Sequence, residues 1–144
     1  MLIYGVCISD IEQFNEDKFM NFFRELYDEG YTHYLDDYLE TRYMKRKHDE
    51  TEYSVQDWLY DFESSGYFGL AAFLKEIIAA LEGLEIACDD PDGIHYLGIL
   101  PDVPWKFTAR TKYISNEEFN QILAGYINKV CDDELEIKWW HHAE

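Results

Sequence analysis

Residues 64–83 decide the fold, and they read SSGYFGLAAFLKEIIAALEG. Only Lys75, Glu76 and Glu82 are charged in this stretch. A serine pair that can cap a helix precedes the apolar run, and Gly83 can adopt the left-handed conformation that ends one. A helix that is apolar on nearly all sides must be covered on most of them. The stretch therefore predicts a central core helix, with a sheet on one side and acidic helices on the other.

Composition and charge restrict the class of protein. The 144 residues carry 30 acidic and 12 basic side chains, which gives a net charge of −18. The apolar content of 47% is that of a folded chain, so a single domain over residues 1–144 is expected. This charge disfavours nucleic acid and anionic membranes as direct ligands and favours a basic protein surface. The alternative is that the charge serves solubility alone.

The cysteines and the N-terminus indicate the compartment. Cys7, Cys88 and Cys131 are odd in number, lie far apart and form no C-x-x-C pair. The first residues carry no basic segment before their apolar run, so they do not resemble a signal peptide. These features predict reduced thiols in a cytoplasmic protein.

Before the core helix the sequence predicts one strand and then several helices. An apolar, β-branched run over residues 2–8 indicates a buried strand. Asn15 is a suitable cap for a helix over residues 16–28, with a phenylalanine-rich apolar stripe. A second helical run is expected over residues 31–47, and a short helix is expected to begin at Ser54.

After the core helix the sequence predicts a hairpin, a helix and a final strand. Residues 84–88 and 94–100 are expected strands, joined by the turn sequence DDPDG at 89–93. Ser115 followed by Glu118 predicts a capped helix, and alternation from residue 135 predicts the last strand. This order predicts an α+β protein with a four-stranded antiparallel sheet. The expected class is ferredoxin-like (split βαβ), with an expanded helical insertion between strands 1 and 2.

Two groups of side chains suggest metal binding. Asp89, Asp90 and Asp92 resemble a fragment of a calcium loop, but the EF-hand spacing and its distal glutamate are absent. His141, His142 and Glu144 could ligate a transition metal, although neighbouring histidines on a strand point to opposite faces. The prediction is therefore no metal and no cofactor, with both groups left open.

Motifs for catalysis are also weak. The chain has no glycine-rich phosphate loop, no G-x-S-x-G and no H-E-x-x-H. Cys7 or Cys88 could pair with His95 if their strands adjoin, but strand cysteines commonly pack in cores. We therefore assign no catalytic residue and expect no enzyme activity. The alternative is a small enzyme or ligand-binding domain that uses the open sheet face around His95 and Trp140.

The remaining feature is a segment rich in acids and tyrosines. Between residues 25 and 63 there are twelve acids and four basic residues. Carboxylates repeated along helices can imitate a row of phosphates, and exposed tyrosines supply contact area. The alternative is that the tyrosines line the core and the carboxylates form a solvated face. The predicted partner-binding residues are Tyr34, Asp36, Asp37, Tyr38, Glu40, Asp57 and Asp61.

In overall character the whole chain resembles small acidic inhibitor proteins of phages and mobile elements, including anti-CRISPR and anti-restriction proteins. Residues 31–38, YTHYLDDY, are the most typical stretch. The resemblance includes no family signature, so no residue role is carried over. It implies a non-enzymatic inhibitor that binds a basic, nucleic-acid-binding surface of a host nuclease or defence protein, as a nucleic-acid mimic. The alternative is an immunity protein that neutralises a toxin, and the oligomeric state is left open.

Overall fold

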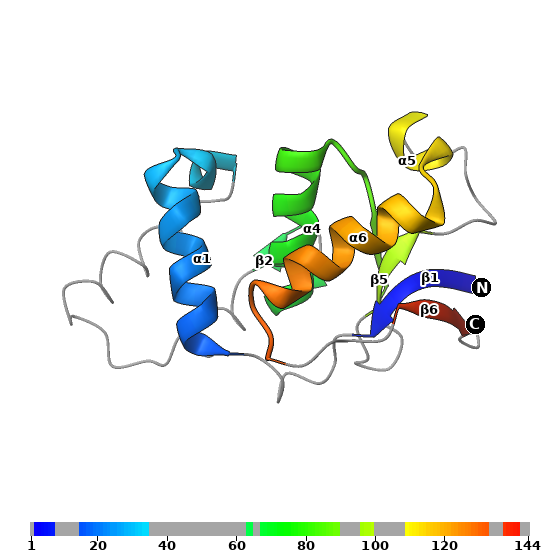
Figure 1. The fold of residues 1–144 in the computed structure, drawn as a ribbon, viewed down its shortest axis with the longest axis horizontal. Coiled ribbons are helices and arrows are strands. Elements are labelled where there is room, and N and C mark those ends of the chain that lie inside the picture. The colour runs from blue at the N-terminus through cyan, green and yellow to red at the C-terminus, as the bar shows by residue number, and fades with distance from the viewer. Residues whose placement is uncertain are drawn as a thin grey trace.

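The computed structural model describes residues 2–7, 15–34, 63–64, 67–89, 96–99, 109–132 and 137–141. Figure 1 shows β1, β5 and β6 at one end of the molecule, together with both chain termini, and α1 at the opposite end. Helices α4 and α6 lie between these two ends. The described elements, in chain order, are β1 (Leu2–Cys7), α1 (Glu16–Asp28), the 3-10 helix η2 (Tyr31–Tyr34), β2 (Glu63–Ser64), β3 (Tyr67–Phe68), α4 (Gly69–Glu82), β4 (Ala87–Asp89), β5 (Tyr96–Ile99), α5 (Ala109–Tyr113), α6 (Asn116–Asn128) and β6 (Lys138–His141).

Helix α4 is the predicted core helix. Eight of its 14 residues are buried, and Gly83 ends it with a φ of 68°. The predicted serine cap is wrong, because Ser64 lies in β2 and pairs with Tyr67. The helix begins instead at Gly69, whose φ of 72° turns the chain from β3 into the helix. Glycine is suited to this position because it adopts positive φ without steric cost.

Helix α1 packs its aromatic stripe against α4. Phe73 of α4 lies 5.0 Å from Phe19, 6.2 Å from Phe22 and 6.3 Å from Phe23, measured between ring centroids. Phe19, Phe23 and Phe73 are fully buried. Burying an aromatic side chain contributes roughly 1.5–3 kcal/mol, so this cluster holds the two helices together.

The N-terminal end of α1 meets the C-terminal end of α6. The Asn15 side chain accepts a hydrogen bond from the Lys18 backbone N–H at 2.9 Å, as the sequence predicts for a cap. Lys18 Nζ donates to the Cys131 carbonyl at 2.6 Å, and the Asn15 backbone N–H donates to the Val130 carbonyl at 2.8 Å. A helix N-terminus and a helix C-terminus carry opposite partial charges, so their contact is favourable.

The larger sheet has the strand order β4-β5-β1-β6, and all three pairings are antiparallel. Tyr4 of β1 is buried against α6: its hydroxyl donates to Asn120 Oδ1 at 2.8 Å and its ring lies 5.9 Å from that of Phe119. Gly5 of β1 pairs with Gly98 of β5 at the centre of the sheet. A Cβ on either glycine would overlap the backbone of the opposite strand, so the two strands can approach this closely only without side chains.

The ferredoxin-like fold class is wrong. More of the described residues lie in helices than in strands, and no described strand other than β1 is longer than four residues. The segment expected to be a purely helical insertion also contains a second sheet, in which β2 and β3 pair antiparallel. In Figure 1, α1 does not cover the larger sheet with the other helices but lies beyond α4. The physical reason is that the aromatic stripe of α1 packs on Phe73 of the core helix.

Other expectations are met in part or lie outside the described residues. The predicted strand at 84–88 begins only at Ala87, where β4 starts; Leu84 and Ile86 are buried but lie in a segment without regular secondary structure. Beyond η2, the helix predicted over residues 31–47 lies outside the described ranges, as does the helix expected from Ser54. Among the described helices, none has the length and apolar content needed to cross a membrane.

Candidate partner-binding surface

The structure places few of the predicted partner-binding residues. Tyr34 ends η2, but its side chain is outside what the structure describes. The other six also lie outside the described residues, namely Asp36, Asp37, Tyr38, Glu40, Asp57 and Asp61. The sequence prediction of these seven residues therefore stays a prediction.

The candidate metal and catalytic residues are similarly placed. Asp89 ends β4 and His141 ends β6, whereas Asp90, Asp92 and His142 lie outside the described ranges. Within the part of the chain that the structure describes, no three His, Cys, Asp or Glu side chains lie close enough together to hold a metal ion.

The described residues do not include enough of the possible cysteine–histidine pair to test it. The same holds for the open sheet face. Cys7 is half-buried in β1, opposite Tyr96 of β5. His95 lies outside the described ranges, and Trp140 lies in β6 with its side chain outside them.

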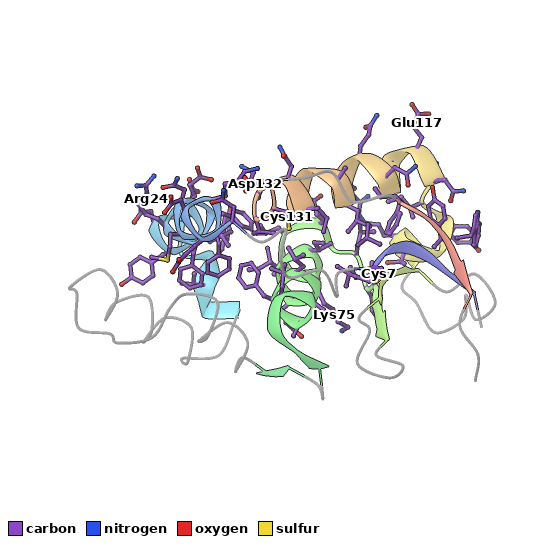
Figure 2. All side chains as sticks on the ribbon, turned by 90° about the horizontal axis from the view of Figure 1, so that it is seen from below. Cys7, Arg24, Lys75, Glu117, Cys131 and Asp132 are labelled. Atoms are coloured by element: carbon purple, nitrogen blue, oxygen red, sulfur yellow. The ribbon has the colours of Figure 1, made fainter. Side chains whose placement is uncertain are left out.

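The described part of the acidic surface is the outer face of α1. We define this α1 outer face by its exposed residues, which are Asp17, Asn21, Arg24, Glu25 and Asp28, followed by Glu29 at the helix C-cap. The buried phenylalanines occupy the opposite side of the same helix. Figure 2 shows Arg24 extending from α1 away from α4. The α1 outer face therefore carries four carboxylates and one guanidinium on the side of the helix that faces away from the core.

Three of these carboxylates are at the end of the helix where its dipole disfavours them. Glu25 and Asp28 lie in the last turn, Glu29 is the C-cap, and the last turn has no basic residue. A helix C-terminus carries a negative partial charge, so acids there are destabilising. Lys129 Nζ lies 3.7 Å from Glu25 Oε2, but both side chains are more than half exposed, and such pairs contribute little. The helix itself gains no stability from this concentration of negative charge.

An exposed tyrosine follows directly on the acidic end of α1. Tyr31 of η2 is 37% exposed, whereas the next residue, Thr32, is buried. Tyrosine offers a large contact area with few rotatable bonds, and it is common at the centre of protein interfaces. The chain continues from η2 into the predicted partner-binding residues, so the acidic, tyrosine-bearing segment begins at Glu25 in the sequence.

Some acids elsewhere in the described structure, such as Glu82 and Glu118, have internal partners. Glu82 Oε1 accepts a hydrogen bond from the Tyr126 hydroxyl at 2.8 Å, and the Glu82 carbonyl accepts one from Arg110 Nε at 2.7 Å. Burial, the hydrogen bond to Glu82 and its charge raise the pKa of Tyr126 well above the ordinary value. Arg110 also lies 3.6 Å from Glu118. These contacts tie the end of α4 to α5 and α6, so they serve the fold.

Comparison with known proteins adds no assignment. No family model, no curated protein and no solved structure matches the chain.

The partner-binding residues predicted from the sequence do not include those of the α1 outer face. The signal for it was present, because Asp17, Glu25 and Asp28 fall between the apolar positions of a helix whose stripe the sequence identified. Acids in the first turn of a helix are ordinary, but acids in the last turn without a cation are not. That asymmetry distinguishes the end of α1 from the start of α6, where Glu117 and Glu118 occupy the favoured end.

Proposed function

We propose that this protein is a non-enzymatic inhibitor that acts in the cytoplasm by binding the basic, nucleic-acid-binding surface of a host nuclease or defence protein. The observation that carries the proposal is the concentration of exposed acids at the C-terminal end of α1, beside the exposed Tyr31. Helix electrostatics disfavour acids at this end of the helix, so these acids serve a function other than the stability of the fold. A basic protein surface is the ligand that such a face fits best.

The arrangement of these acids suits imitation of a nucleic-acid backbone. Asp28 and Glu29 follow Glu25 by three and four residues, which places the Cβ atom of each roughly 5–6 Å from that of Glu25. A groove that binds nucleic acid presents lysines and arginines to a close series of phosphates. Carboxylates at this spacing offer such a groove an anionic ligand, and Tyr31 adds an apolar contact.

The first test uses charge reversal at the end of α1. The double variant Asp28→Lys/Glu29→Lys changes the charge by +4, as does the control Glu85→Lys/Glu117→Lys, in which both altered side chains are exposed and lie elsewhere. Figure 2 shows the control residue Glu117 extending from α6 away from the rest of the molecule. The partner is captured from nuclease-treated host lysate, purified and titrated against each variant.

We expect the α1 variant to bind about tenfold or more weakly than the control, a loss that shrinks as salt is raised. A second variant, Asp36→Lys/Asp37→Lys/Glu40→Lys, tests the segment predicted from the sequence, and we expect a loss at least as large. Equal binding by the wild type, both charge-reversal variants and the control would show that the acids do not form the interface.

A further inference from the structure

Among the described strands, β6 lies at one edge of the larger sheet. In the order β4-β5-β1-β6 it pairs with β1, and no other described strand pairs with it. In an antiparallel ladder the backbone groups of alternate residues point toward the partner, so half of those in β6 point away from β1. Such an edge is a template for one more strand.

A large apolar side chain lies on this edge. Trp139 is 48% exposed, and its ring centroid is 4.9 Å from that of Tyr4 on β1. The indole packs against the buried Tyr4, and about half of the Trp139 surface remains accessible. Tryptophan is among the residues that contribute most when an interface buries them.

The charge distribution distinguishes this edge from the other one. Residues 137–143 read IKWWHHA and contain no acid, although 30 of the 144 residues are acidic. The opposite edge strand, β4, ends at Asp89, and the chain continues with Asp90, Pro91 and Asp92. Acids and proline discourage pairing of an edge. Two molecules that each carry a charge of −18 repel one another, and their repulsion is least where acids are absent.

We propose that two copies of this chain associate through their β6 edges, antiparallel about a two-fold axis. In this arrangement the two four-stranded sheets become one, and each Trp139 is covered at the junction. A two-fold axis presents the same residues from both sides, so one exposed edge suffices for both copies. An edge of four residues buries less than the roughly 1,200 Å² of a standard stable interface, so the dimer dissociates on dilution.

The test is sedimentation velocity on the full chain at concentrations from about 1 µM to about 500 µM, which detects dissociation constants in that range. We expect the weight-average mass to rise with concentration toward twice that of the monomer. Lys138→Glu places an added negative charge on both sides of the junction, and we expect it to raise the dissociation constant about tenfold or more. Lys75→Glu on α4 makes the same charge change away from the junction and should leave the constant unchanged.

Two further measurements make the test decisive. Trp139→Ser removes the exposed indole and should also weaken association, with circular dichroism and thermal melting to show that each variant is folded. Raising the salt concentration should strengthen the dimer, because salt screens the repulsion between two acidic molecules. Binding of a basic partner responds to salt in the opposite direction, so this result is independent of the proposed inhibitor function.

Three results would overturn the proposal. The first is a monomer throughout the concentration range at both low and high salt. The second is association that folded Lys138→Glu or folded Trp139→Ser leaves unchanged. The third is association that Lys75→Glu weakens as much as Lys138→Glu does, which would place the contact elsewhere.

Discussion

At the scale of single residues, the tightest steric constraint is at the pair of glycines in the centre of the larger sheet. Gly5 and Gly98 are direct partners of β1 and β5, and both are buried. Each lacks the atom that would collide with the backbone of the other strand. The sequence alone does not reveal this, because a glycine within a strand pattern is equally compatible with a bulge.

We expect Gly5→Ala and Gly98→Ala each to destabilise the fold by about 1–3 kcal/mol, the usual cost of overpacking. The added Cβ would overlap backbone, which cannot move aside as the end of a side chain can. Gly125→Ala is the control, because nothing lies within 4 Å of the added atom and the residue is in α6. Urea denaturation should show the control to be stabilised by about 0.5–1 kcal/mol, the helical advantage of alanine. Wild-type stability in both strand variants would contradict the close strand approach.

A second residue-scale prediction concerns the Tyr126–Glu82 hydrogen bond. Because the pKa of Tyr126 is raised in the folded state, the folded protein holds this proton above pH ~10, where the unfolded chain loses it. Stability from this group is therefore complete below pH ~10 and is lost as the pH rises above it.

Tyr126→Phe removes both the hydrogen bond and the titrating group. We expect it to lower the free energy of unfolding at pH ~7 by about 0.5–1.5 kcal/mol. Between pH ~9 and pH ~11 its stability should fall less steeply than that of the wild type. Tyr113→Phe alters a tyrosine that is 77% exposed and should retain the wild-type slope. A Tyr126→Phe slope equal to that of the wild type would show that the hydroxyl does not couple to folding.

At the scale of elements, the sequence predicts helices better than the connections between them. The bounds of α1, its cap at Asn15 and the stop of α4 at Gly83 are confirmed, because caps and apolar periodicity are local signals. The β2–β3 pair was not predicted, since two-residue strands have no period to detect. The packing of α1 on Phe73 was missed for another reason: an apolar stripe shows that a helix is covered but not what covers it.

The N-cap residues of α1 and α6 differ in the number of hydrogen bonds that their side chains make. Asn15→Ala removes the side chain that accepts from the Lys18 N–H and also donates to Asp132 Oδ1 at 2.7 Å. Ser115→Ala removes one such bond, to the Glu118 N–H at 3.1 Å. Loss of a cap typically costs about 1 kcal/mol, so we expect the first variant to be the more destabilised, by up to about 2 kcal/mol. Chemical denaturation measures both, with Asn21→Ala in the exposed middle of α1 as a near-neutral control. A larger loss for Ser115→Ala would contradict the double role of Asn15.

At the scale of the whole molecule, the main feature is the large negative net charge. A net charge of −18 on 144 residues opposes compaction, and the exposed ion pairs Arg110–Glu118 and Lys129–Glu25 offset little of it. The sequence predicted this surplus and the acidic, tyrosine-rich segment over residues 25–63, but the end of α1 was not among the predicted partner-binding residues. Which acids gather on one exposed face depends on how α1 lies against α4, and that is a tertiary contact.

Salt should therefore stabilise the fold. We expect the melting temperature to rise as sodium chloride increases from about 10 mM to about 500 mM, where the Debye length falls from about 30 Å to a few Å. The variant Asp28→Lys/Glu29→Lys should melt higher than the wild type at low salt, because it removes surplus charge and suits the helix dipole. A wild-type melting temperature that salt leaves unchanged would contradict a stability limited by self-repulsion.

The most direct measurement of the proposed inhibitor function is competition between this protein and duplex DNA for the purified partner nuclease. We predict that the wild-type protein displaces DNA at saturation and that no ternary complex forms. The variant Asp28→Lys/Glu29→Lys should displace DNA far less well than Glu85→Lys/Glu117→Lys. A stable complex of partner, DNA and this protein, or equal displacement by the two double variants, would contradict it.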